Sequence, residues 1–385
     1  MKRLTLRDVA ELAGVSMGTA SNAINKPELV GEETRERVLK AIRDLGFVRN
    51  NAARQLRRGR NQAIGLVVLD IDNPFFTALA RGVEDAANEA DHLLILCSSA
   101  SSTAREDRQL RLLEEQRVAG ILMSPVRRDP SRPVHEIRSR GTPIVLLDRG
   151  RSPRDQCSAA VNDTSGGRLV AEHLLTLGHE RLGLINGPRS LKPCAERRAS
   201  FLAALGERGL ALPLTHDLET AEMTVSAGED AAEQVLSHGR RPTALFCTND
   251  LLAIGAEHAA LNRGLRIPED LAIVGYDDIR FAATSFVPLT SVRMPAYELG
   301  YRATELLIDE ATNASRHRHQ RLLFEPELVV RQSTEPAGRH SVVGSPGLEG
   351  PGLTALSVAK PRTVRSERRD HSRPKRGPST SAGRR

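Results

Sequence analysis

The N-terminal end of the chain carries LTLRDVAELAGVSMGTASNAIN, residues 4–25, in which two short amphipathic helix patterns meet at Gly14. Thr5 followed by Asp8 is typical of a helix N-cap, and the apolar side chains around them recur every three or four residues. Gly14 allows the backbone to turn, and Ser16 can cap a second helix whose small residues let it pack closely across the first. The stretch therefore predicts a helix-turn-helix.

This geometry predicts a DNA-facing surface on the second helix, whose outward side chains would read base edges in the major groove. A third helix is expected at residues 32–45, with acidic side chains in its first turn and basic ones later. Three small helices used only for packing are the alternative. In this headpiece, residues 1–48, the expected DNA contacts are Thr5, Ser16, Met17, Gly18, Thr19, Ser21, Asn22 and Asn25.

Charge is distributed unevenly along the 385 residues. Lys and Arg outnumber Asp and Glu by 13 to 7 in residues 1–60 and by 11 to 3 in residues 336–385, whereas acids lead by 38 to 31 between them. The net charges of these three parts are therefore +6, +8 and −7. Basic ends around an acidic body are expected when one end meets DNA phosphates. Solubility alone is an alternative reason for a basic headpiece.

From residue 63 onward, short apolar runs alternate with longer helical patterns. Runs at residues 64–69, 92–96, 120–123 and 144–147 are typical of parallel strands buried on both faces. A second set follows residue 158, so we expect two doubly wound α/β lobes. Ligands bind at the carboxyl ends of such strands. Polar residues gather there, namely Asp70, Asp72, Asn73, Asp148, Asn249, Asp250, Asp277 and Asp278.

The headpiece and the body together resemble the lactose-repressor (LacI/GalR) family of bacterial regulators. In the headpiece the resemblance rests on Leu6-x-Asp8-Val9-Ala10-x-x-Ala13-Gly14-Val15-Ser16-x-x-Thr19. In the body it rests on Asn73-Pro74-Phe75-Phe76, Leu177-Gly178-His179, Thr248-Asn249-Asp250 and Val274-Gly275-Tyr276-Asp277-Asp278. The matching motifs extend to about Ser333, so the resemblance covers most of the chain.

The resemblance implies an all-α helix-turn-helix headpiece, a hinge at residues 49–62, and a two-lobed core at residues 63–335 that is similar to periplasmic sugar-binding proteins. That core would contain two doubly wound parallel sheets. In the family, the paired hinges of a dimer fold on DNA and insert a leucine into the minor groove. A plain basic linker is the alternative here. The hinge residues expected to meet DNA are Asn50, Ala53, Leu56 and Arg57.

For the effector, the resemblance implies a cleft between the two lobes. Carboxylates and amides there would bind pairs of hydroxyls, Arg197 would donate a planar fork, and an aromatic ring would pack on the apolar face of a sugar. The alternatives are that Asn249 is only a helix N-cap and that Asp277 only orders a loop. The expected contacts are Asn73, Phe75, Phe76, Asp148, Arg197, Met223, Asn249 and Asp277.

Some positions depart from the family pattern where specificity is written. Asn22 stands where arginine is common, which favours readout through hinge insertion and DNA deformability over bidentate arginine contacts. Met223 stands where some sugar-binding members have a stacking tryptophan, and this chain has no Trp. A cleft poor in aromatic rings could favour a small polar ligand other than a sugar.

The sequence therefore predicts a repressor that binds operator DNA as a homodimer and responds to a small polar effector, foremost a sugar or sugar derivative. We expect it to be cytoplasmic and nucleoid-associated, without cofactor, metal or membrane partner, because it has no signal peptide, membrane-length apolar run or metal-spaced His/Cys pattern. Its four scattered cysteines are expected to be free thiols. The alternatives are a small-molecule-binding protein and a carbohydrate-acting enzyme that uses the cleft carboxylates. No phosphate-binding loop or nucleophile elbow supports the enzyme.

The last segment, residues 336–385, is rich in Arg, Ser, Pro and Gly and lacks helical or strand periodicity. This composition predicts disorder. Its basic charge could strengthen non-specific DNA binding at low salt. The alternative is an extension that only keeps the protein in solution and has no role in DNA binding.

Overall fold

The computed structural model describes residues 4–47, 62–127, 132–147, 156–335 and 362–363. The chain forms two compact units, Met1–Asn61 and Gln62–Arg385. Five residues with a predicted role lie outside the described residues, and their roles stay predictions: Asn50, Ala53, Leu56, Arg57 and Asp148.

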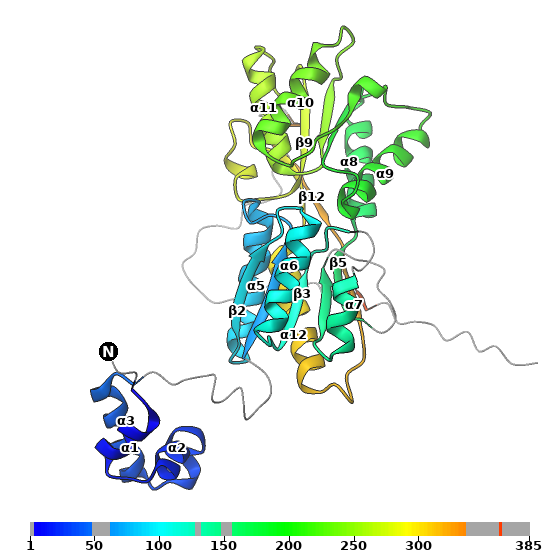
Figure 1. Ribbon diagram of the computed structural model, residues 1–385. Coiled ribbons are helices and arrows are strands. Elements are labelled where there is room, and N and C mark those ends of the chain that lie inside the picture. The colour runs from blue at the N-terminus through cyan, green and yellow to red at the C-terminus, as the bar shows by residue number, and fades with distance from the viewer. Residues whose placement is uncertain (1–3, 48–61, 128–131, 148–155, 336–361, 364–385) are drawn as a thin grey trace, which may run out of the picture. The chain divides into compact units, whose positions relative to one another are not determined.

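The headpiece consists of α1 (Leu6–Ala13), α2 (Met17–Asn25), the 3-10 turn η1 (Pro27–Leu29) and α3 (Glu32–Leu45) (Figure 1). The Asp8 carboxylate caps α1, because it accepts hydrogen bonds from the backbone N–H of Thr5 at 2.7 Å and from its hydroxyl at 2.6 Å. Small side chains let the helices approach closely, and the buried core consists of Val9, Ala10, Ala13, Ala20, Ala23, Val38 and Ala41. The predicted helix-turn-helix with a third helix is confirmed.

The first lobe of the body is a sheet with helices on both faces (Figure 1). Its strand order is β13-β11-β5-β4-β3-β1-β2. These strands are β1 (Ala63–Val68), β2 (Leu93–Ser98), β3 (Gly120–Met123), β4 (Ile144–Leu147), β5 (Ser158–Val161), β11 (Arg321–Phe324) and β13 (Arg362–Thr363). Alternate strand residues face α5 (Pro74–Glu89) and α12 (Ala296–Thr312) on one side, and α6 (Thr103–Glu115) and α7 (Arg132–Ser139) on the other.

The second lobe repeats this plan with strand order β12-β10-β9-β8-β6-β7. The strands are β6 (Leu182–Asn186), β7 (Asp217–Glu219), β8 (Ala244–Cys247), β9 (Ala272–Asp277), β10 (Thr290–Arg293) and β12 (Glu327–Val329), with the short turns η2 (Leu214–His216) and η3 (Ala282–Thr284). One face packs on α8 (Asp163–Thr176) and α9 (Lys192–Gly206), and the other on α10 (Val225–Ser237) and α11 (Asp250–Asn262). The predicted pair of doubly wound parallel lobes is confirmed.

Within the described residues, the chain passes between the two lobes three times, from β5 to α8, from β10 to α12 and from β11 to β12. Two of these connections are tied together, because Asn162 Nδ2 donates to both carboxylate oxygens of Glu325 at 3.1 Å. The two described residues of the predicted disordered tail depart from that prediction, since β13 pairs antiparallel with β11. None of the described helices is both long enough and apolar enough to span a bilayer.

Candidate functional site: a DNA-facing helix and an interlobe cavity

The second helix of the headpiece presents a polar face. Met17, Gly18, Asn22 and Asn25 are exposed, whereas Thr19 and Ser21 are half-buried. The Asn25 side chain is oriented by its own helix, because Nδ2 donates to the Ser21 carbonyl at 2.8 Å. This face of α2 can therefore offer amide and hydroxyl groups to a DNA groove.

Two of the predicted DNA contacts also hold helix ends. The Ser16 hydroxyl accepts the backbone N–H of Thr19 at 3.0 Å and caps α2, while the Thr5 hydroxyl donates to Asp8 at the start of α1. Capping satisfies donors that the first turn of a helix leaves without intrahelical partners. Both residues thus have a structural role in the headpiece, and their contacts to DNA stay predictions.

The body contains a cavity of about 450 Å³ between its two lobes. Six of the predicted effector contacts line it: Asn73, Phe75, Phe76, Arg197, Met223 and Asp277. They come from the start of α5 in the first lobe, and from α9, the end of β9 and the loop before α10 in the second. The volume suits a small molecule, and the wall combines apolar side chains with a few convergent polar ones.

Asn73 links the two lobes across this cavity. It caps α5 by accepting the Phe75 backbone N–H at 2.9 Å, and its Nδ2 donates to Asp277 Oδ2 at 3.1 Å. Capping fixes the Asn73 side chain, so its amide points at the second lobe. Phe75 and Phe76 follow in the first turn of α5 with their ring centroids 5.1 Å apart, and they form the apolar side of the cavity.

Arg197 is the buried cation of the cavity, with its side chain 6% exposed. Its Nε donates to Asp163 Oδ1 at 2.8 Å, and one terminal nitrogen donates to the Thr248 carbonyl at 2.7 Å and to Asp277 at 3.4 Å. The guanidinium also lies 3.7 Å from the ring centroid of Tyr276. Two carboxylates around one arginine leave an excess negative charge, which can accept hydrogen bonds from ligand hydroxyls.

Two adjacent glycines of α8, Gly166 and Gly167, explain how Arg197 and Tyr276 reach their places. A Cβ on Gly166 would lie 2.0 Å from the Tyr276 hydroxyl, and one on Gly167 would lie 2.3 Å from the Arg197 carbonyl oxygen. Only glycine allows α8 to approach the second-lobe sheet and α9 this closely. The Tyr276 hydroxyl can then donate to Asp163 at 3.1 Å.

Asp277 sits at a turn of unusual backbone geometry. Its φ is +104° and that of Asp278 is +50°, a region that residues with side chains rarely adopt. The turn is held from outside the cavity, because Asp250 accepts the Ile279 backbone N–H at 2.7 Å and Asp278 accepts from Arg293 Nε at 2.8 Å. Asp278 therefore orders the loop, while Asp277 is left facing the cavity.

Asn249 does not line the cavity. It is fully buried, caps α11 by accepting the Leu252 backbone N–H at 2.9 Å, and donates to the Met223 carbonyl at 3.3 Å. These contacts agree with the alternative of a helix N-cap. Met223 does face the cavity, and a role of Asn249 in effector binding stays a prediction.

The cavity also contains residues that the sequence analysis did not assign to it. Ser101 follows the carboxyl end of β2, where the strand-end rule could have found it. Cys194 and Met294 are apolar positions without a chemical signal in the sequence, although Arg197 contacts the Met294 sulfur at 3.4 Å. Glu222 lies in an irregular loop that no periodicity marks.

Two family models match the chain, one for each unit. Residues 5–50 match the model of bacterial regulatory proteins of the lacI family, and residues 171–334 match that of a periplasmic binding protein-like domain. The Ribose operon repressor of Escherichia coli (strain K12) is 36% identical over 333 residues, which are 86% of this chain and 99% of that repressor.

Solved structures of the same architecture are also similar. A transcriptional regulator CelR–cellobiose complex is 31% identical with a TM-score of 0.64, over 86% of this chain and 100% of that one. The lac repressor dimer bound to operator and the anti-inducer ONPF is 26% identical with a TM-score of 0.76, over 86% of this chain and 99% of that one.

A helix-turn-helix headpiece joined to a two-lobed core with a cavity between the lobes defines a ligand-responsive DNA-binding protein. The chain belongs to the lacI family of bacterial regulatory proteins. It is a transcriptional regulator that binds DNA, and the alternative of a carbohydrate-acting enzyme is set aside because its relatives are repressors.

Proposed function

We propose that this protein is a repressor that binds a two-fold symmetric operator as a homodimer, under the control of a sugar or sugar derivative held in the interlobe cavity. Binding to operator DNA would place it at the nucleoid, in the cytoplasm. The observation that carries the effector half of the proposal is the buried set Asn73, Arg197 and Asp277, which joins both lobes at the cavity wall. A ribose operon repressor and a cellobiose complex among the relatives support a sugar.

The coupling would work through the hydrogen bond between Asn73 and Asp277. The Asn73 amide and the Asp277 carboxylate contact each other directly at 3.1 Å. A sugar that forms hydrogen bonds with both side chains must therefore either move them apart or link them through its hydroxyls. An effector shifts an equilibrium only by its differential affinity for two states. A sugar held by both lobes favours the lobe arrangement in which its hydroxyls meet both residues. The hinge at residues 49–62 would transmit that choice to the headpiece.

The DNA half of the proposal is tested by in vitro selection of random duplex DNA with the full-length protein near physiological salt. Enrichment of a palindrome with a flexible central step is the expected outcome. Binding without any sequence enrichment would contradict an operator-specific repressor.

The selected duplex then tests the effector half. Operator affinity is measured by fluorescence anisotropy with and without D-ribose, cellobiose and other sugars, and direct binding is measured by calorimetry. We expect one sugar to bind the protein and to change operator affinity at least tenfold, which corresponds to about 1.4 kcal/mol of coupling. Unchanged operator affinity with every sugar would reject a sugar effector and leave the DNA half standing.

A further inference from the structure

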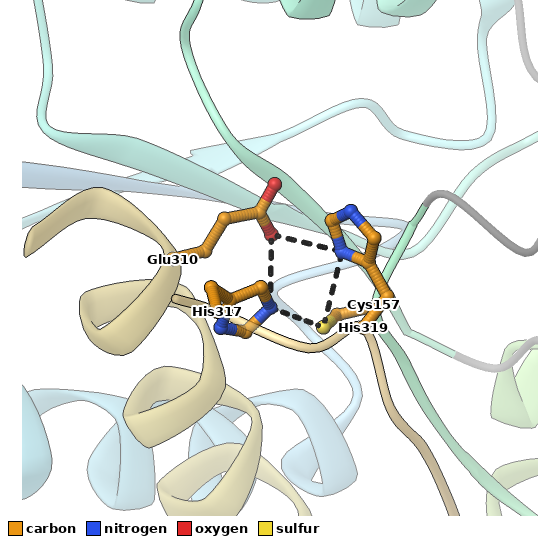
Figure 2. Close-up of side chains that lie close together, drawn as sticks. All are labelled: Cys157, Glu310, His317 and His319. Atoms are coloured by element: carbon orange, nitrogen blue, oxygen red, sulfur yellow. Dashed lines mark hydrogen bonds and ion pairs between the residues drawn. The ribbon is translucent and has the colours of Figure 1, made fainter. Parts of the chain in front are cut away.

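The first lobe contains a second cluster of chemically reactive side chains, away from the interlobe cavity. We name Cys157, Glu310, His317 and His319 the CHHE cluster (Figure 2). Cys157 immediately precedes β5, Glu310 lies in the last turn of α12, and the two histidines lie in the loop between α12 and β11. Figure 2 shows the four side chains pointing toward one another from these separate segments.

The potential ligand atoms of the CHHE cluster are close together. Cys157 Sγ lies 3.1 Å from His317 Nε2 and 3.8 Å from His319 Nδ1. Glu310 Oε2 lies 3.8 Å from each of the same two nitrogens. All four atoms fall within 4.8 Å of one another. One sulfur, two nitrogens and one oxygen therefore surround a common centre.

These separations match the edges of a tetrahedron around a metal ion. Zinc bonds of about 2.3 Å to sulfur and about 2.0 to 2.2 Å to nitrogen and oxygen place neighbouring ligand atoms about 3.3 to 3.7 Å apart. Four of the six separations are 3.1 to 3.8 Å and need shifts of only a few tenths of an ångström, while the remaining two, Cys157 Sγ to Glu310 Oε2 and His317 Nε2 to His319 Nδ1, lie within 4.8 Å. Thiolate and imidazole ligands favour zinc over magnesium or calcium, which prefer oxygen.

The surroundings of the cluster also resemble those of a metal site. Cys157 is fully buried and the His317 side chain is only 2% exposed. The Asp309 carboxylate accepts a hydrogen bond from His317 Nδ1 at 2.7 Å, so Nε2 is left to face the cluster. A carboxylate behind a ligand histidine is the usual means of orienting the ring and raising its basicity.

We propose that the CHHE cluster is a closed four-ligand binding site for a divalent transition metal, foremost Zn²⁺. The binding step is balanced: the ion takes up one lone pair from each ligand atom, and the Cys157 S–H proton leaves to solvent. Burial is the main reason that the pKa of the Cys157 thiol is raised to about 11. The negative charges of Glu310 and Asp309 also raise this pKa, whereas the backbone N–H of Gln320 and the positive charge of Arg138 lower it. Without the ion the residue is therefore a thiol at neutral pH, and metal uptake releases a proton.

The site would fasten parts of the chain that are far apart in sequence. Cys157 lies 160 residues before His317, and it immediately precedes β5, which leads directly into the first connection between the lobes. β5, β4, β3 and β1 are parallel, so the amino end of β5 lies on the same edge of the sheet as Ala63, where β1 begins. A bound ion would hold the α12–β11 loop against that edge.

Metal content provides the first test. The full-length protein is stripped with a chelator, loaded with Zn²⁺, desalted and analysed by elemental mass spectrometry, with Mg²⁺ as the ion that should not be retained. We expect one zinc per chain. Loading with Co²⁺ should give the intense visible bands of a tetrahedral site and a sulfur-to-cobalt charge-transfer band. If the protein retained no zinc after loading, and if the Co²⁺-treated protein showed no charge-transfer band, the proposal would be overturned. The role of these residues would then be a thiol–imidazole hydrogen bond.

Variants assign the ion to these residues. Cys157→Ser should remove the charge-transfer band, and His319→Gln, at a 29% exposed side chain, should lower zinc affinity at least about 100-fold while the fold is kept. Asp309→Asn should lower it about 10- to 100-fold through the orientation of His317. The matched controls are Cys97→Ser in β2 and His135→Gln on the exposed side of α7. Zinc affinity in His319→Gln equal to that of the controls would contradict the site, even if Cys157→Ser failed to fold.

Discussion

At the scale of single residues, Asp277 is where the geometry of the cavity is most specific. One of its carboxylate oxygens meets Asn73 and the other meets Arg197, on a backbone with a φ of +104°. Asp277→Asn keeps the shape but removes the charge. Because a hydrogen bond to a charged group contributes about 1.5 to 3 kcal/mol, sugar affinity should fall about 10- to 100-fold by calorimetry.

The neighbouring residue supplies the control for that prediction. Asp278 accepts from Arg293 Nε at 2.8 Å and forms an ion pair with Arg331 at 2.7 Å, and it does not line the cavity. Asp278→Asn should lower thermal stability and leave sugar affinity nearly unchanged. Equal losses of affinity in the two variants would mean that the loop, and not the Asp277 carboxylate, carries the effect.

Glu257 of α11 predicts a pH-dependent stability. Burial raises the pKa of its carboxyl from 4.5 to about 8, and the Ser285 hydroxyl lowers it by less. The folded chain keeps a proton that the unfolded chain loses above about pH 4.5, so stability falls as pH rises from there toward 8. Glu257→Gln should remove this loss, which is of the order of 5 kcal/mol. The thermal midpoints of Glu257→Gln and the unmodified protein should be similar at pH 5, and that of Glu257→Gln should be higher at pH 8.5. Glu269→Gln, at an exposed side chain, should behave like the unmodified protein at both pH values.

At the scale of elements, the turn between α1 and α2 predicts a difference between two glycines. Gly14 has a φ of +64°, and no atom lies near the position that a Cβ would take. Gly14→Ala should therefore destabilise the headpiece only because alanine disfavours the left-handed backbone conformation, by about 1 to 2 kcal/mol. In Gly18→Ala the new Cβ would make an ordinary 3.7 Å contact with Ser16 Oγ, and alanine favours the helix. Hydrogen exchange of α1 to α3 in the full chain should quicken in Gly14→Ala only. Faster exchange in both variants would argue against a conformational cause.

The elements that the sequence predicted are those with a strong local signal. α1 to α3 repeat apolar residues at helical spacing, and β1, β3 and β4 are continuous apolar runs that lie buried on both faces. The edge strands β7 and β12 were not predicted, because three residues with partly exposed side chains show no period. Their positions come from pairing with distant strands.

The candidate sites divide in the same way. Asn73, Arg197 and Asp277 were predicted because family motifs and strand ends mark them. The CHHE cluster was not predicted, because the sequence shows no metal-spaced His/Cys pattern. His317 and His319 are two residues apart in the sequence. The other two potential ligands of the cluster are more distant, because Glu310 lies at the end of a helix and Cys157 lies far back in the chain. Tertiary structure alone brings those four residues together.

At the scale of the whole molecule, the division into two compact units predicts which parts of the chain an effector stabilises. The headpiece has its own core, and the cavity lies wholly within residues 62–385. Without DNA, a sugar at 100 times its dissociation constant should stabilise the body by about 2.7 kcal/mol and raise its thermal midpoint by about 5 °C. Amide exchange should slow at the start of α5, in α9 and at the end of β9, and stay unchanged in α1 to α3. Asp277→Asn is the control, and slowed exchange in the headpiece without DNA would instead mean that the two units are already coupled before the operator binds.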